Sequence, residues 1–180
     1  MFLAAAPLPP PRTATLPLGV LEQAFRLVPT FCAARVMASG LRMAGVRMGK
    51  TSAFWGFPTL AGAGDVCSRL SMGEFCGVNF GCYFELDAEI TFEDHVSVGH
   101  EVMFLTRTHA RDDSSQRGRT TGARPIHVGK GAWLGARSTI LPGVTIGAGS
   151  VVGASVVVRE DVPPNTLFTG QRKISIAKWR

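Results

Sequence analysis

The side chains best able to do chemistry lie in one long polar stretch, residues 106–125, whose sequence is TRTHARDDSSQRGRTTGARP. This stretch contains His109, and a neutral imidazole can accept the proton of an attacking hydroxyl group near pH 7. The stretch lacks the aliphatic period found on both sides of it, so we expect a loop that leaves the fold. Long loops in compact domains usually carry functional residues, and this loop therefore marks the candidate site.

Cysteine is the alternative nucleophile. The four cysteines stand at positions 32, 67, 76 and 82 and form no CxxC pair. Cys76 and Cys82 are six residues apart, a spacing expected of two core positions, so we interpret both as small buried side chains. We therefore discount Cys82 as a nucleophile, although it lies close to Asn79. Cysteines used in this way indicate a reducing, cytoplasmic setting.

A period of six organises the chain after Met48. Every sixth residue from Val128 onward is aliphatic: Val128, Leu134, Ile140, Ile146, Val152 and Val158. A glycine directly follows four of these aliphatic residues. Small residues recur at the fourth position after an aliphatic residue. A short fixed period indicates a solenoid in which each unit forms a strand and a turn, and three units close one coil. We therefore predict an all-β solenoid with columns of aliphatic side chains inside.

The same period continues upstream with interruptions. Met72, Val78 and Phe84 form one phase, and Phe92, Val98 and Phe104 form another. The shift between them implies two residues inserted within 86–89. Before Met72 the period is weaker, so we expect an irregular first coil. The repeat domain is predicted to span residues 46–170, preceded by a leader and helical segment at 1–45 and followed by a tail at 171–180.

The segment before the repeats is predicted to be partly helical. Residues 1–15 are rich in proline and alanine and are expected to be a mobile leader. From Leu16 to about Met43, apolar residues recur at three- and four-residue intervals, which predicts helix broken near Pro29. The simpler interpretation packs this helix on the main domain. Its arginines at 26, 35 and 42 could instead lie on an acidic membrane surface, and neither a signal peptide nor a membrane-spanning segment is expected.

Composition narrows the class of protein and of partner. The 180 residues, 46% of them apolar, suffice for one domain with a core, and 21 glycines are more than an ordinary two-layer domain uses. The formal charge of +6 favours an anionic partner such as a phosphorylated cofactor, an acidic membrane or nucleic acid. Aromatic and basic residues do not interleave in a recognisable module, so we reject nucleic-acid binding.

The segment IHVGKGAWLGARSTILPGVTIGAGSVVGASVVVREDVPPNTLFTG, residues 126–170, resembles the C-terminal half of the hexapeptide-repeat acyltransferases. It is most similar to the branch that O-acetylates sugars, galactosides and exopolysaccharide precursors, and the likeness extends over residues 46–173. The resemblance implies a left-handed parallel β-helix and a homotrimer. It also implies transfer of an acetyl group from acetyl-CoA to a hydroxyl of a sugar, polysaccharide precursor or glycosylated natural product, without a metal.

The resemblance also assigns site residues. FLTRTHARDD is similar to the stretch that holds the family's catalytic histidine, which implies that His109 is the general base. GVNFG matches the asparagine that orients the acceptor or the thioester, which implies the same for Asn79. For acetyl-CoA the resemblance implies the small residues Ala136 and Ala154, with Trp133 as a wall of the pantetheine channel. The family's lysine before the Pro-Pro pair is absent, so Arg159 or Lys173 could supply the charge for phosphate.

Two other functions are considered on this fold. SVGHEV resembles a coil-corner histidine of the gamma-type carbonic anhydrases, whose zinc needs three protein ligands. His95 and His100 could supply two, but no histidine precedes His95. A non-catalytic scaffold is the second alternative, and it gives no reason for a polar loop that bears a histidine.

Overall fold

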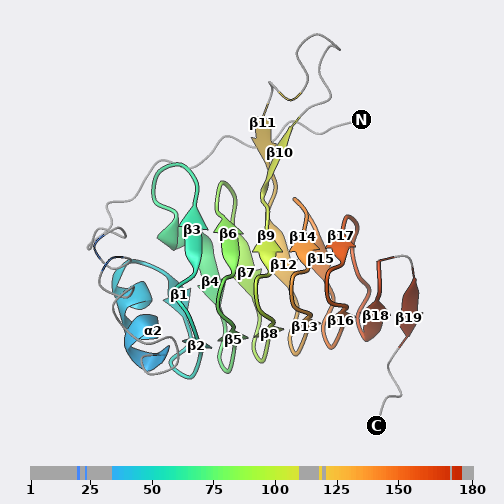
Figure 1. Cartoon of the computed structure of the whole chain (residues 1–180), viewed down its shortest axis with the longest axis horizontal. Coiled ribbons are helices and arrows are strands. Elements are labelled where there is room, and N and C mark those ends of the chain that lie inside the picture. Colours follow the sequence, from blue (N-terminus) through green and yellow to red (C-terminus); the bar gives the residue numbers. More distant parts are fainter. Residues whose placement is uncertain are drawn as a thin grey trace.

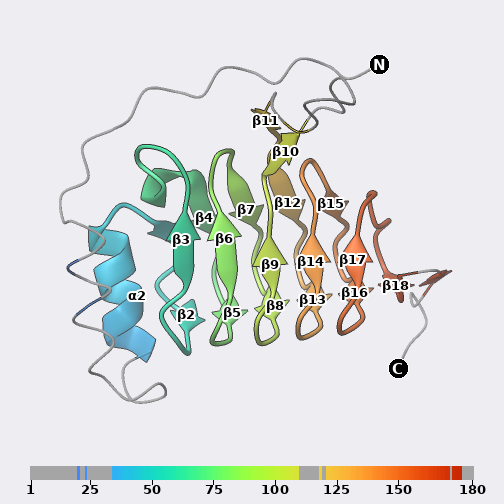
Figure 2. The same cartoon turned by 45° about the horizontal axis from the view of Figure 1, so that its top comes forward.

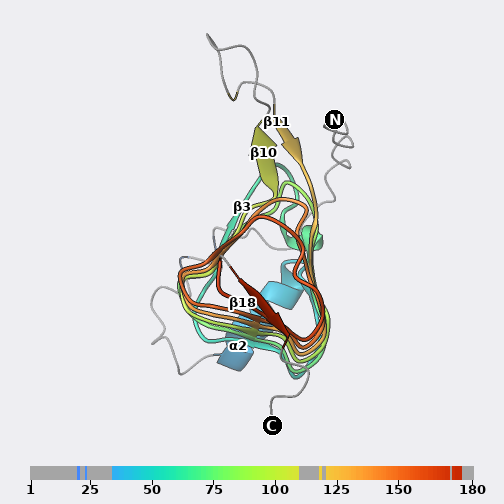
Figure 3. The same cartoon turned by 90° about the vertical axis from the view of Figure 1, so that its right-hand side faces the viewer.

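Short β-strands follow one another around three faces of a coil, and successive coils stack into a prism (Figure 1). The computed structural model describes residues 34–109, 121–170 and 172–175, together with the single residues 20, 23 and 118. Figure 3 looks along the stack and shows the roughly triangular outline of the coils. The predicted parallel β-solenoid is therefore confirmed, and its left-handed sense follows from the resemblance.

Five complete coils each contribute one strand to each of three sheets. Sheet 1 contains β1 (Arg47–Met48), β4 (Leu70–Met72), β7 (Ile90–Phe92), β12 (Ile126–Val128) and β15 (Thr145–Ile146). Sheet 2 contains β2 (Ala53–Phe54), β5 (Gly77–Val78), β8 (Ser97–Val98), β13 (Trp133–Leu134), β16 (Val151–Val152), β18 (Thr166–Phe168) and β19 (Lys173–Ser175). Sheet 3, turned toward the viewer in Figure 2, contains β3 (Thr59–Ala61), β6 (Tyr83–Glu85), β9 (Met103–Phe104), β14 (Thr139–Ile140) and β17 (Val157–Val158). We call the turns between these sheets the 1–2, 2–3 and 3–1 corners.

The six-residue period corresponds to the inward columns of the core. The six aliphatic residues that repeat from Val128 to Val158 are all 0% exposed. Ala132 and Ser138, which stand four places after such residues, are buried at the corners. A Cβ on Gly135 would lie 2.6 Å from the backbone nitrogen of Ala154 in the next coil. Glycine therefore recurs at this place because stacked backbones approach too closely for a side chain.

Three insertions into the period lie at the 3–1 corner. Residues 62–69, with the 3-10 helix η1 (Cys67–Arg69), join β3 to β4, and residues 86–89 join β6 to β7. The predicted insertion at 86–89 is thus confirmed. The expected irregularity of the first coil is only partly right, because β1, β2 and β3 all pair in parallel register with the second coil. Only the connection at 62–69 departs from the period.

The third insertion is the predicted loop. It begins and ends as an antiparallel hairpin of β10 (Arg107–His109) and β11 (Thr121–Ala123), which projects away from the solenoid between β9 and β12 (Figures 1 and 3). The strands are in register, with Arg107 opposite Ala123 and His109 opposite Thr121. The hairpin is therefore an arm whose direction is set where it leaves the 3–1 corner.

Helix α2 (Ala34–Met43) covers the N-terminal end of the stack (Figure 1). Met37 and Leu41 are buried in the core cluster, and Nη1 of Arg42 donates to the carbonyl of Gly49 at 3.1 Å. These contacts favour the packing interpretation of the helix. Val20 and Gln23 are also helical, while Arg26 and the other residues of the predicted helix before Ala34 lie outside the described residues. Nothing helical among the described residues is long and apolar enough to span a membrane.

The C-terminal end of the stack is closed by an additional strand. Residues 173–175, which the sequence assigns to a tail, form β19 and pair antiparallel with β18 at the edge of sheet 2. The last coil therefore ends in an antiparallel pair rather than in an open parallel edge.

Candidate active site

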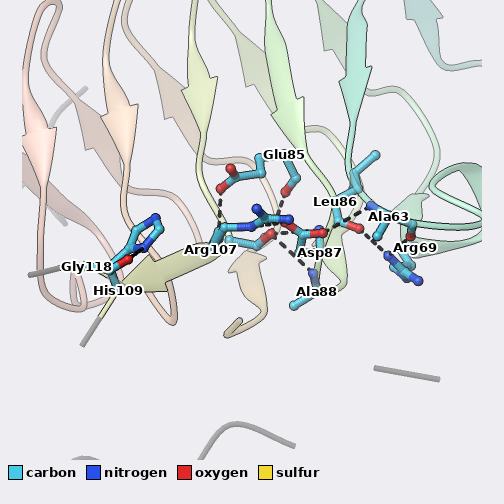
Figure 4. Close-up of polar contacts among 10 residues, drawn as sticks. Ala63, Arg69, Glu85, Leu86, Asp87, Ala88, Arg107, His109 and Gly118 are labelled. Carbon is cyan, nitrogen blue, oxygen red and sulfur yellow. Dashed lines mark hydrogen bonds and ion pairs between the residues drawn. The ribbon is translucent and has the colours of Figure 1, made fainter. Parts of the chain in front are cut away.

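His109 has one ring nitrogen fixed by a hydrogen bond. Its Nδ1 lies 2.7 Å from the carbonyl oxygen of Gly118, on the returning side of the arm (Figure 4). A carbonyl oxygen can only accept, so Nδ1 donates, and in the neutral ring Nε2 has no proton. The side chain is exposed, so a substrate hydroxyl can reach Nε2. This is the tautomer and the access that a general base requires.

Charged and polar groups join the root of the arm to the solenoid (Figure 4). Nε of Arg107 donates to Oδ2 of Asp87 at 2.6 Å, and the backbone N–H of Arg107 donates to the carboxylate of Glu85 at 2.8 Å. The hydroxyl of Thr106 donates to the carbonyl of Glu85 at 2.6 Å. We call Glu85, Asp87, Thr106 and Arg107 the root cluster.

Burial and charge act in opposite directions on Asp87. Burial by itself would raise the pKa of this carboxyl, whose side chain is only 3% exposed. The hydrogen bond from Arg107, the backbone N–H of Ala63 and the charges of Arg107 and Arg69 outweigh it and lower the pKa below its usual value. The same contact raises the pKa of Arg107. Asp87 is therefore an ionised, buried carboxylate at neutral pH.

Asn79 follows β5 at the 2–3 corner and is half-buried. Its Nδ2 donates to the carbonyl of Val98 at 3.1 Å, so the side chain partly satisfies local backbone. An amide nitrogen has two protons, and one of them is used in this bond. Within one subunit β6 separates the 2–3 corner from the 3–1 corner, so Asn79 and His109 belong to opposite edges of sheet 3. The structure does not bring these two residues together in a single chain.

Three of the residues assigned to the cofactor lie on sheet 2 and the corner after it. Trp133 stands on the outer side of β13 and is 56% exposed. Ala136 and Ala154 occupy the same place in successive coils, where the N–H of Ser155 donates to the carbonyl of Ala136 at 2.8 Å. Asn79 lies at the same corner, two coils before Ala136. The 2–3 corner thus offers small side chains and backbone polar groups in one row.

The two basic residues assigned to phosphate lie near the C-terminal end. Arg159 lines a cleft of about 640 Å³ together with Val157 and Phe168, and it makes no hydrogen bond or ion pair with any residue that the structure describes. Lys173 is engaged, since its Nζ lies 3.2 Å from a carboxylate oxygen of Glu160 and 2.9 Å from a backbone carbonyl. Arg159 is therefore the freer of the two to bind a phosphate.

The repeat itself has known counterparts. Residues 125–160 match the family model described as bacterial transferase hexapeptide (six repeats). This segment of the chain carries the hexapeptide repeat of that family.

Relatives of this hexapeptide-repeat protein include transferases. A candidate acetyltransferase of Schizosaccharomyces pombe is 40% identical over 100 residues, which are 56% of this chain and 48% of the relative. The galactoside O-acetyltransferase of Escherichia coli K12 is 31% identical over 103 residues, 57% of this chain and 51% of the relative. The chain thus spans about half the length of the curated relatives it matches.

One solved structure resembles the whole solenoid. The crystal structure of the hexapeptide-repeat-containing acetyltransferase of Vibrio cholerae is 27% identical, covers 89% of this chain and 89% of that chain, and gives a TM-score of 0.74. A structure of that protein complexed with acetyl-CoA covers 82% of this chain and 87% of that chain, with a TM-score of 0.61.

The cysteines of this hexapeptide-repeat protein are poor nucleophiles. Burial raises the pKa of the Cys82 thiol to about 11 and also raises that of Cys76. Burial, with a contribution from the charge of Asp65, raises the pKa of Cys67 to about 11. Because the thiolate is the reactive form, these thiols are inert at neutral pH, as the six-residue spacing of Cys76 and Cys82 predicted. Cys32 lies outside the described residues.

The two histidines of the zinc alternative do not converge. His95 lies before β8 at the 1–2 corner and stacks on Phe75 with ring centroids 4.9 Å apart. His100 lies after β8 at the 2–3 corner, with its ring 4.4 Å from that of Phe80. In the part of the chain that the structure describes, no three His, Cys, Asp or Glu side chains could hold a metal ion together.

The root cluster is the part of the site that the sequence interpretation missed. The insertion at 86–89 was recognised, but the role of its aspartate was not. The sequence separation of Asp87 and Arg107 indicates their contact. These two residues are 20 positions apart, the same separation as Tyr83 and Met103, which pair between the same two coils. Opposite charges at this separation are therefore expected to meet on neighbouring coils.

Proposed function

We propose that this protein is a CoA-dependent O-acetyltransferase that moves an acetyl group from acetyl-CoA to a hydroxyl of a sugar, polysaccharide precursor or glycosylated natural product. The observation that carries the proposal is the exposed side chain of His109, whose Nδ1 lies 2.7 Å from the Gly118 carbonyl, so that in the neutral ring Nε2 carries the free lone pair. The resemblance to galactoside O-acetyltransferase and the acetyl-CoA complex of the Vibrio cholerae protein support the substrate classes.

The proposed reaction is direct transfer. Nε2 of His109 takes the proton of the acceptor hydroxyl as its oxygen attacks the thioester carbon. The C–S bond of the tetrahedral intermediate then breaks, and the proton passes from His109 to the departing thiolate. The second proton of the Asn79 amide can bind the thioester oxygen as negative charge develops on it. No acyl-enzyme is needed, which agrees with the high pKa of the Cys82 thiol.

The position of acetyl-CoA and the number of chains that form one site follow from the arrangement of the corners. Acetyl-CoA would lie along the 2–3 corner at Ala136 and Ala154, beside Trp133, with Arg159 available for phosphate. Since Asn79 and His109 lie at opposite edges of sheet 3, a site that uses both must take them from two copies of the chain. This supports the homotrimer implied by the resemblance, with each arm reaching a neighbouring 2–3 corner. A cytoplasmic location, in contact with acetyl-CoA, suits such an enzyme.

The test is release of free thiol from acetyl-CoA in the presence of a panel of sugars and glycosides. His109→Ala should lower kcat about 10²- to 10⁴-fold, because removing a general base costs that much, while acetyl-CoA still binds in calorimetry. His127→Ala is the matched control, since this partly exposed histidine lies on sheet 1 and binds Glu93. Turnover by His109→Ala at the wild-type rate would contradict the general-base role. Failure of the wild-type protein to bind acetyl-CoA would contradict the proposed activity.

Mixing two inactive variants tests the shared site. If Asn79 and His109 come from different subunits, mixed oligomers of His109→Ala and Asn79→Ala contain some sites with both residues intact, and part of the activity should return. Mixed oligomers, verified by mass, that remain as inactive as either parent would show that both residues act within one chain.

A further inference from the structure

The arm that holds His109 is attached to the solenoid through a buried carboxylate. Asp87 accepts the backbone N–H of Ala63 at 3.1 Å on Oδ1 and Nε of Arg107 at 2.6 Å on Oδ2. Arg69, itself buried, donates from Nη1 to the carbonyls of Ala63 at 2.9 Å and Leu86 at 2.6 Å. The contacts therefore link all three insertions of the 3–1 corner, as Figure 4 shows.

Arg107 connects this network to the catalytic histidine. It is the first residue of β10 and His109 is the last. Side chains two residues apart in a strand point to the same side, so the Asp87 contact restrains the face of the arm on which His109 lies. The N–H of Arg107, bound by Glu85, restrains the backbone at the same point. Two independent bonds thus set the position and rotation of β10.

Thr106, the residue before Arg107, is held by three further hydrogen bonds. The residue is 0% exposed, and its hydroxyl group donates to the carbonyl of Glu85 and accepts the N–H groups of Asp87 at 3.1 Å and Ala88 at 3.2 Å. A cleft of about 330 Å³ adjoins the cluster, but both oxygens of Asp87 and Nε of Arg107 are already bonded within it. These described bonds of the cluster hold the chain at the 3–1 corner.

We propose that Asp87 and Arg107 are positioning residues for the transfer reaction: their ion pair sets the direction of the arm and so places Nε2 of His109 at the acceptor hydroxyl. This inference rests on the proposed role of His109 as the general base. A displacement of about 1 Å in a reacting group can cost 10²-fold in rate, so a small rotation at the root is enough to matter.

Two variants break the pair in different ways. Asp87→Asn keeps the shape and one acceptor oxygen but removes the charge. Arg107→Gln removes the guanidinium from a side chain that is 42% exposed, so it leaves the core unchanged. Glu74→Gln is the matched control, because Glu74 is also a carboxylate with a lowered pKa that joins two coils, through Thr51 and Lys50, but it has no contact with the arm. Asp87→Glu keeps the negative charge and tests whether the charge alone restores kcat.

Two readouts separate positioning from stability. Both variants should lower kcat about 10- to 100-fold at a temperature where they are folded, with the KM for acetyl-CoA unchanged within about twofold. The backbone amide chemical shifts of Thr108 and His109 should change in Asp87→Asn, because the ion pair orients β10, whereas the Nδ1–H tautomer of His109 should persist, because its bond to Gly118 lies within the arm. Asp87→Glu should recover part of kcat, and Glu74→Gln should match the wild type in both readouts.

The outcomes distinguish this inference from the proposed function. If Asp87→Asn and Arg107→Gln only lower the melting temperature, while kcat and, in Asp87→Asn, the amide shifts of Thr108 and His109 stay as in the wild type, the pair merely stabilises the corner and the inference is wrong. If the wild type shows no transferase activity, but these amide shifts move in Asp87→Asn and not in Glu74→Gln, the arm is positioned as inferred and the proposed reaction is wrong.

Discussion

A single methyl group at Gly135 should destabilise the solenoid by separating two coils. The Cβ of Gly135→Ala would lie 2.6 Å from the backbone nitrogen of Ala154 and 2.8 Å from the carbonyl oxygen of Val152. Backbone atoms cannot rotate away, so coils 4 and 5 must move apart and lengthen the 2.8 Å bond from Gly135 N–H to the Val152 carbonyl. Overpacking costs about 1–3 kcal/mol and a weakened hydrogen bond about 1 kcal/mol. The lower entropy of the unfolded alanine chain returns up to about 1 kcal/mol, which leaves a net loss of about 1–4 kcal/mol.

Gly153 supplies a control at the same place in the repeat. A Cβ there meets its nearest atom, Cγ2 of Val156, at 3.4 Å, which is an ordinary contact, because no regular coil follows. Gly153→Ala should therefore be neutral or stabilise by up to about 1 kcal/mol. Urea unfolding followed by circular dichroism gives both values, with m compared to check that the solenoid still unfolds as one unit. Equal unfolding free energies for the two variants, within about 0.5 kcal/mol, would refute the view that glycine is required by coil spacing.

Three further predictions follow from buried polar groups. Ser138 and Ser150 are both buried at the same place in the repeat, but Oγ of Ser150 donates to a carbonyl at 2.7 Å, whereas Oγ of Ser138 has no hydrogen-bond partner among the described residues. Alanine should therefore cost about 1–2 kcal/mol at Ser150 and nothing at Ser138, and equal losses in chemical unfolding would contradict this. Cys82 should resist a thiol reagent at pH 8 in the folded protein and react after unfolding, as seen by peptide mass mapping, because burial raises its pKa to about 11. The pKa of Asp87 is lower in the folded protein than in the unfolded chain, so its ionised form stabilises the fold above the unfolded pKa of about 4, and this stabilisation is lost as the pH falls through the folded pKa. The difference in melting temperature between wild type and Asp87→Asn should therefore become smaller below pH 4. A difference that does not change with pH would show that the charge of Asp87 does not stabilise the fold.

The sequence was sufficient to predict the solenoid because its core is periodic. Each inward residue from Val128 to Val158 meets the equivalent residue of the next coil, so one local pattern specifies every contact along a column. The first coil was harder to predict. Met48, Phe54 and Leu60 keep the period, but the inserted residues 62–69 double the spacing to Met72, and the pattern alone cannot tell an insertion from an irregular coil.

The site was only partly predictable, for a related reason. His109 stands out because a polar loop interrupts an apolar repeat. Its hydrogen bond to Gly118 could not be foreseen, since it depends on how the arm folds back on itself. Asn79 could be placed at a corner, but its separation from His109 across sheet 3 became clear only when the strands were assigned to sheets. The structure thus adds a geometric argument to the homotrimer that the resemblance implies.

The position of the insertions explains how a regular solenoid acquires a specific site. Residues inserted at a corner leave the strands in register, so each insertion is tolerated alone. Insertions in successive coils can touch only if they occur at the same corner, and here residues 62–69, residues 86–89 and the arm all leave at the 3–1 corner. Their contacts meet at Asp87, which is buried because insertions on both sides cover it. The charge of Asp87 is tolerated in this place because Arg107, the N–H of Ala63 and the charge of Arg69 together outweigh its burial. The contact that restrains the first residue of β10 is therefore also one that allows Asp87 to be buried.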